Sequence, residues 1–203
     1  METEHTVHKT LEHRWNERLV EQLDVHWRVA LRPRLEGLTD HEYRWEPVPD
    51  CWDVRPRGES GPAFDGALTG GAGDFTIDFA FPEPTPPPVT TIAWRLGHLI
   101  VGVLGARNAS HFGGPAIDYR THEYAGTSAA ALEQLDDVYA RWVSGVRGLG
   151  EDGLFRRCGP AEGPYAQSPL ADLVLHINRE VIHHGAEIAL LRDLYVHRAG
   201  GTD

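Results

Sequence analysis

Apolar positions recur at helical spacing in four stretches of the chain, and polar residues fill the positions between them. Threonines, serines or a Ser-Pro pair stand where three of these stretches begin, and glycines stand near most of their ends. Pro33 should kink or locally break the first helix. The predicted helices span about residues 15–37, 91–110, 128–148 and 169–198, and a short helical turn should follow Thr39.

The segment 46–89 interrupts this pattern, because it holds most of the prolines and many of the glycines. Such a composition excludes a long helix. Apolar and polar residues alternate from 75 to 81, which predicts a short strand, and further apolar side chains such as Phe64 can pack near it. A loop this long is either a functional lid or pocket wall, or a flexible insertion without a role, and both interpretations stay open.

Four long helices with one long connection predict an all-α fold. We expect a four-helix bundle in which 46–89 forms a Pro- and Gly-rich crossover between the first two helices. The length of 203 residues suits a single domain over 1–203, with 46–89 as a loop insertion. Gly97, Val101 and Gly105 form a ridge of small residues on the second helix, so another helix can approach closely there.

Composition and charge narrow the range of partners. The net charge of -11 argues against nucleic acid and against an anionic membrane surface, because both attract clustered basic residues. No apolar run approaches the roughly 20 residues of a spanning helix, and the polar start at residues 1–8 is not a signal peptide. Cys51 and Cys158 are expected to be free thiols of a cytoplasmic protein. Lys9 is the only lysine beside many arginines, which suggests GC-rich codons and an actinobacterial source.

The fourth predicted helix carries the clearest chemical pattern. Glu180 and His184 are four residues apart, so they share a face and can hold one divalent cation. His98, in an apolar run of the second helix, is the candidate third ligand, and three ligands leave the open position of a catalytic site. His183 and His176 are rival ligands at similar spacing. Each of these residues could also be an ordinary core histidine or surface charge.

The residues around this pattern favour a metal site. Glu180 and His184 border the apolar face of the helix, where a carboxylate needs a partner to stay charged. Gly185, directly after His184, leaves room for close approach. Glu187 is placed to accept a hydrogen bond from an imidazole N–H and so to orient a histidine ligand.

Two motifs together resemble the DinB-like superfamily, also called the YfiT-like metal-dependent bundles: Trp94-Arg-Leu-Gly-His98 and Arg179-Glu-Val-Ile-His-His-Gly-Ala-Glu187. Most members carry His-x3-His on the last helix. Here Glu180 stands first, as in the branch with mycothiol-dependent maleylpyruvate isomerase, and the segment 46–52 is similar to a recurring feature of an actinobacterial subgroup.

The resemblance implies that His98, Glu180 and His184 bind a metal ion, and it favours His184 over His183 because the ligand directly precedes a glycine. Zinc is the implied ion, with nickel or iron as other candidates. The implied activity is that of an enzyme that activates a low-molecular-weight thiol, mycothiol, for S-transfer to a small electrophile or for its isomerisation. Zinc suits this because it accepts N, O and S ligands and keeps a thiol deprotonated.

Two other functions are compatible with the same residues. One is a thiol-independent hydrolase, cyclase or lyase of a biosynthetic pathway, in which the metal activates water or a carbonyl group. The other is a non-enzymatic, stress-related protein with a structural metal. In each enzymatic case we expect small molecules as partners, with Arg95 and Arg192 as candidate contacts for a carboxylate. A homodimer is one possible assembly.

Overall fold

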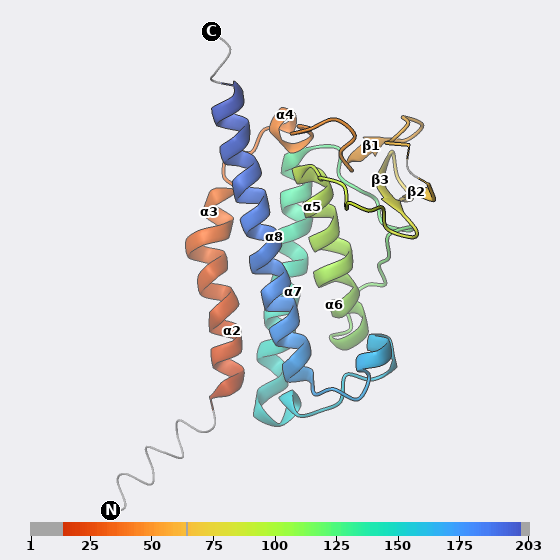
Figure 1. Cartoon of the computed structure of the whole chain (residues 1–203). Coiled ribbons are helices and arrows are strands. Elements are labelled where there is room, and N and C mark those ends of the chain that lie inside the picture. Colours follow the sequence, from red (N-terminus) through yellow and green to blue (C-terminus); the bar gives the residue numbers. More distant parts are fainter. Residues whose placement is uncertain (1–13, 64, 200–203) are drawn as a thin grey trace, which may run out of the picture.

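A computed structural model describes residues 14–63 and 65–199 (Figure 1). The chain is mostly helical. The helices are α2 (Trp15–His26), α3 (Arg32–Arg34), α4 (Asp40–Tyr43), α5 (Ile92–His98), α6 (Ala106–His111), α7 (Ser128–Leu154) and α8 (Leu170–Ala199), and the connection before α8 holds the 3-10 turn η3 (Pro160–Tyr165). No helix in the described ranges is both long and apolar enough to cross a lipid bilayer. The expectations for residues 1–8, Lys9 and Phe64 lie outside the described residues.

Two of the predicted helices are continuous columns in which α-helical and π-helical turns follow one another. α2 passes through the π-helical segment η1 (Trp27–Leu31) into α3, and α5 passes through η2 (Leu99–Gly105) into α6. The irregularity expected at Pro33 therefore lies just before the proline. The first column ends soon after it, and Gly37 takes a positive φ of 69° as the stop.

Threonine caps begin the helices where the sequence predicts them. The hydroxyls of Thr39, Thr91 and Thr127 each accept a hydrogen bond from the backbone N–H three residues ahead. α7 continues beyond the expected end to Leu154, across Gly150, whose φ of 62° and ψ of -177° are not helical. α8 begins after Ser168-Pro169, as predicted.

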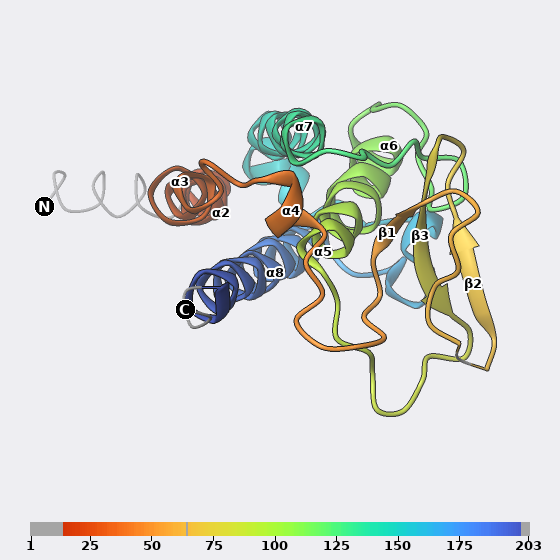
Figure 2. The ribbon, with the colours of Figure 1, turned by 90° about the horizontal axis from the view of Figure 1, so that it is seen from above.

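The segment 46–89 builds a small antiparallel sheet. Its strands are β1 (Val54–Pro56), β2 (Ala67–Gly70) and β3 (Phe75–Ala80), in the order β1-β3-β2. The strand predicted at 75–81 is thus confirmed, although Phe81 falls beyond its end. The all-α expectation is confirmed only as far as a mostly helical chain, since alternating apolar residues found strand partners on both sides. Figure 2 shows this sheet beside α5, on the side away from α2 and α3.

The core lies between the long helices. α2 contacts α7 and α8, and the column of α5 and η2 contacts both α7 and α8. The predicted apolar face of α8 is buried at Leu173, Ile177, Val181 and Ile188, and Leu191 is half-buried. Gly185 lies against Leu31, where an added Cβ would come within 2.8 Å of a leucine methyl, so the expected close approach at this glycine is confirmed.

The ridge of small residues on the second helix is covered by a strand and a loop, so the prediction that another helix packs there is wrong. A Cβ at Gly97 would lie 3.2 Å from Ile77 of β3 and 3.2 Å from Tyr124. A Cβ at Gly105 would lie 3.0 Å from Ile117. The connection between α6 and α7 therefore passes close to the helical column that carries His98.

Candidate metal centre

His98 of α5 and His184 of α8 face each other between two helices that lie side by side (Figure 1). Their ring centroids are 4.8 Å apart, and the rings are almost perpendicular, at 89°. Glu180 lies one turn before His184, and its Oε2 is 3.4 Å from Nε2 of His184. The structure thus brings His184 into contact with each of the other two residues that the sequence singled out.

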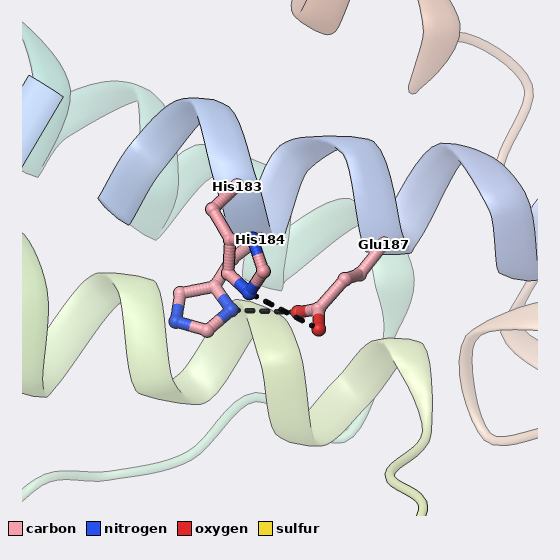
Figure 3. A group of neighbouring side chains, drawn as sticks. All are labelled: His183, His184 and Glu187. Carbon is pink, nitrogen blue, oxygen red and sulfur yellow. Dashed lines mark hydrogen bonds and ion pairs between the residues drawn. The ribbon is translucent and has the colours of Figure 1, made fainter. Parts of the chain in front are cut away.

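The two nitrogens of the His184 ring have different neighbours. Nδ1 lies 2.7 Å from Oε2 of Glu187, whereas Nε2 faces Glu180. Figure 3 shows the interaction of His184 with Glu187 as a dashed line. Arg95 holds the same Glu187 oxygen at 3.1 Å through Nε. With its side chain only 9% exposed, His184 is fixed in one orientation, and Glu187 occupies the acceptor position predicted for it.

His98 is held in a comparable way from the sheet and loop side. Its Nδ1 lies 2.7 Å from the hydroxyl of Tyr119, and the indole of Trp94 stacks on the ring at 5.3 Å and 14°. The Trp94 indole N–H in turn donates to the carbonyl of Asp78 in β3, at 2.7 Å. With Nδ1 directed at Tyr119, Nε2 of His98 is the nitrogen left for a ligand.

Burial sets the protonation states of His98 and Tyr119. Desolvation, with the nearby charges of His184 and Arg95, lowers the pKa of His98 to about 4, so the ring is neutral at physiological pH. Desolvation raises the pKa of Tyr119 to about 12, so its hydroxyl keeps its proton. A neutral imidazole is the form that binds metal ions, and one tautomer donates Nδ1–H to the Tyr119 oxygen and leaves Nε2 as the electron-pair donor.

Tyr119 is the site residue that sequence reasoning missed. It lies in the connection between α6 and α7, which carries no periodic pattern. Its hydroxyl reaches His98 because Gly102, one turn further along the same column, has no side chain: a Cβ there would overlap that hydroxyl and lie 3.3 Å from Nδ1 of His98. A glycine four residues after a candidate ligand was the available signal.

A second group of possible ligands overlaps the first. The ligand atoms of His183, His184 and Glu187 all lie within 4.8 Å of one another (Figure 3), and His98 and Glu180 are not members of this group. His183 Nε2 is 3.4 Å from Glu187, and the His183 side chain is 62% exposed. The two candidate ligand sets use different nitrogens of the His184 ring. Nδ1 points to Glu187, and Nε2 points to Glu180.

Glu180 is half-buried, less enclosed than the sequence suggested. Its side chain is 25% exposed, and its Oε1 lies 3.6 Å from His176 Nδ1 and 3.7 Å from Arg179 Nε. Of these two neighbours, Arg179 places a positive charge near the carboxylate. Of the two arginines considered as substrate contacts, Arg95 lies at the site, whereas Arg192 pairs with the buried Glu42.

Two cavities open along α8 on either side of the two histidines. One, of about 700 Å³, reaches α8 at His176 and Arg179 and is also lined by Arg107, Glu162 and Tyr165. The other, of about 500 Å³, is lined by Arg95 and Glu187 and continues toward the end of α8. Cavities of this size hold small molecules. Both cysteines are free and buried, and burial raises the pKa of each thiol, so neither is primed as a nucleophile.

The chain is mostly helical, and histidines and carboxylates lie together between two of its helices, as in a helical protein with a metal site. A family model of the DinB superfamily matches residues 22–188, and the chain belongs to the DinB superfamily. The resemblance seen in the sequence is thereby confirmed at the level of the superfamily, which is compatible with a metal-dependent enzyme. Searches of curated proteins and of solved structures found no match.

Proposed function

We propose that the protein is a metal-dependent enzyme of the mycothiol-dependent branch of its superfamily. It activates a low-molecular-weight thiol for S-transfer to a small electrophile, or for isomerisation of that electrophile. The observation that carries this proposal is the arrangement of His98 and His184: they come from different helices, and a side chain behind each ring engages its Nδ1. Three protein ligands would leave room for a substrate, unlike a closed structural site.

The ligands we assign are His98, Glu180 and His184, with zinc as the ion and nickel or iron as alternatives. Two imidazole nitrogens and a carboxylate form a donor set that zinc accepts. The rival group with His183 is less suitable, because its Glu187 already serves Arg95 and Nδ1 of His184. When bound, such an ion supplies the Lewis acidity that keeps a thiol deprotonated near neutral pH.

The side chains around the ligands orient the imidazole rings and bind the thiol substrate. Glu187 and Tyr119 fix the orientation of the two imidazole rings, so the rings need little reorganisation when a metal ion binds. The cavity at His176 and Arg179 offers guanidinium and imidazole N–H groups, which suit the polar carrier of a thiol such as mycothiol. Two residues that line this cavity, His176 and Arg179, lie 3.6 and 3.7 Å from Glu180, which supports the approach of a thiol to the centre from this side.

We further infer a single cytoplasmic domain over 1–203 on a four-helix-bundle scaffold, whose partners are small molecules. Contacts of α2 with α7 and α8, and of the α5 column with both, support a bundle. The net charge of -11 supports the exclusion of nucleic acid and anionic membranes as partners. A homodimer is one possible assembly.

The test combines metal analysis with thiol consumption. Purified protein should contain a stoichiometric divalent metal and should deplete one thiol of a panel in the presence of a generic electrophile such as monobromobimane. His98→Ala, Glu180→Ala and His184→Ala should each abolish the metal-dependent reaction, whereas His183→Ala should retain it. Full activity in His98→Ala, or a metal-free protein indifferent to every thiol, would contradict the proposal. Turnover without any thiol would select the hydrolase, cyclase or lyase alternative.

A further inference from the structure

The cavity of about 500 Å³ beyond His184 has an apolar wall made by two separate parts of the chain. Trp45, Pro47 and Val48 lie where the segment 46–89 begins, and Pro88, Val89 and Thr90 lie where it ends. Leu190, Leu191 and Leu194 of α8 complete this wall. Both ends of the inserted segment therefore shape a pocket, which is the functional alternative left open by its length.

Several large apolar side chains of this wall remain accessible. Val48 is 45% exposed, Val89 46%, Leu190 58% and Leu194 47%. They converge on one concave pocket, so a ligand with an apolar body would remove apolar area from water at several points together. The pocket is held in shape by Arg198, which donates to the carbonyl of Pro47 at 2.7 Å.

The charged residues of the pocket favour an anion. Among the described residues that line it, two arginines, Arg95 and Arg198, stand against one carboxylate, Glu187, which pairs with Arg95 at 3.1 Å. This local excess of positive charge contrasts with the net charge of -11 of the whole chain. Arg95 also lies close to the candidate centre, with Nη1 3.5 Å from Nδ1 of His184. A planar guanidinium at that position suits a carboxylate or a similar anion.

We propose that this pocket binds the acceptor substrate, and that the acceptor is an amphipathic anion. Its anionic group lies at Arg95, its aryl or alkyl body extends along Leu190 and Leu194, and its electrophilic carbon lies close to the anionic end. The acceptor role rests on the proposed function, whereas the class of ligand rests on the pocket alone. With the polar cavity on the other side of Glu180, the two substrates approach the centre from opposite ends of α8.

Two fluorescent probes test the class of ligand. 8-Anilino-1-naphthalenesulfonate and N-phenyl-1-naphthylamine share the same rings, and only the first carries a negative charge. The native protein should bind the anionic probe at one site, about tenfold more tightly than the neutral probe. Arg95→Gln should remove the preference for the anionic probe. Leu194→Gln should lower the affinity for both probes about fivefold.

Leu175→Gln is the matched control, because Leu175 lies on the same helix, is 48% exposed and does not line this pocket. It should leave both affinities within about twofold. Equal affinity for the two probes, or anionic-probe binding that Leu194→Gln does not change, would overturn the proposal. Circular dichroism and metal content of each variant show that the fold and the centre persist.

The two proposals fail in different ways. A pocket with the expected probe pattern in a protein that transfers no thiol would overturn the proposed function and the acceptor role together, and keep the ligand class. Thiol transfer that persists while the probe pattern is absent would overturn the pocket assignment alone.

Discussion

The hydroxyl of Tyr119 occupies the space that a side chain at Gly102 would need. The same hydroxyl lies 2.7 Å from Nδ1 of His98, one turn before Gly102 on the same helical column. The missing side chain, the loop tyrosine and the histidine therefore act as one unit, and the orientation of the His98 ring depends on a residue that makes no hydrogen bond to it.

Gly102→Ala should weaken metal binding. The added methyl group displaces the Tyr119 hydroxyl and leaves the His98 ring without its orienting partner, which typically costs about 10- to 100-fold in metal affinity. Competition with a chromophoric chelator measures this. The control is Gly148→Ala, since Gly148 is helical with no atom near an added Cβ. That variant should keep metal affinity and raise stability by up to about 1 kcal/mol.

Tyr119→Phe should also reduce metal affinity, by about tenfold, because Nδ1–H of His98 loses its acceptor. Tyr43→Phe separates this effect from a general loss of stability. The Tyr43 hydroxyl donates to the carbonyl of Ala125 at 2.9 Å, in the core, so its loss should cost about 1 kcal/mol and leave metal binding unchanged. Isothermal titration with zinc would show both outcomes, and equal affinities of the two variants would argue against an orienting role for Tyr119.

The choice between the two ligand sets predicts opposite phenotypes for neighbouring histidines. With His98, Glu180 and His184 as ligands, His98→Ala should lower zinc affinity by several orders of magnitude, and His183→Ala should change it less than threefold. His98→Ala removes one coordination bond to the metal ion. The His183 side chain is mostly exposed to solvent and holds no metal ion in this set. Zinc titrations of the two variants decide the matter, because the reversed order would assign the site to His183, His184 and Glu187.

Asp53 should make the protein less stable as the pH rises from about 4 to 6. This carboxyl is 5% exposed, accepts a hydrogen bond from the Thr91 hydroxyl, and burial raises its pKa to about 6. In that window the folded state binds more protons than the unfolded state, so the free energy of unfolding falls with rising pH. Asp53→Asn keeps an oxygen acceptor for Thr91 and should remove most of this slope.

Urea unfolding of the native protein and of Asp53→Asn, at pH 4.5, 5.5 and 7, would measure the two slopes. The Asn variant should gain relative stability as the pH increases. A constant difference between the two proteins over the whole range would show that Asp53 titrates normally. Burial also raises the pKa of Asp78 and lowers that of His98, and both contributions are present in the two proteins, so the difference between the two curves reports Asp53.

Gly185→Ala should destabilise the fold by about 1 kcal/mol, although alanine is the better helix former. Its Cβ would lie 2.8 Å from the buried Leu31, and overpacking of this kind costs about 1–3 kcal/mol. The gain in helix propensity is at most about 1 kcal/mol. Thermal unfolding should show a lower midpoint than that of the native protein, and an increase would mean that Leu31 moves aside without cost.

Local signals account for what the sequence predicted well. Capping threonines act within one helical turn, so Thr39, Thr91 and Thr127 marked true helix starts. The i, i+4 spacing likewise placed Glu180 beside His184, and the spacing of three residues placed Glu187 at its Nδ1.

Features that depend on distant parts of the chain were not predictable in this way. Tyr119 reaches His98 only because the connection from α6 to α7 passes back over Gly102, and no periodicity records such a return. β1 and β2 are three and four residues long, too short to show alternation, and they form because β3 pairs with both.

η2 has a consequence for chain length. An α-helix advances by about 100° per residue, so a wider π-helical turn takes up extra chain without rotating the helix beyond it. A version of this protein one residue shorter between Leu99 and Gly105 could keep the faces of α5 and α6 and lose the local widening beneath Tyr119. Among relatives, insertions and deletions in these seven residues would thus alter how closely the loop approaches His98, even where every ligand is retained.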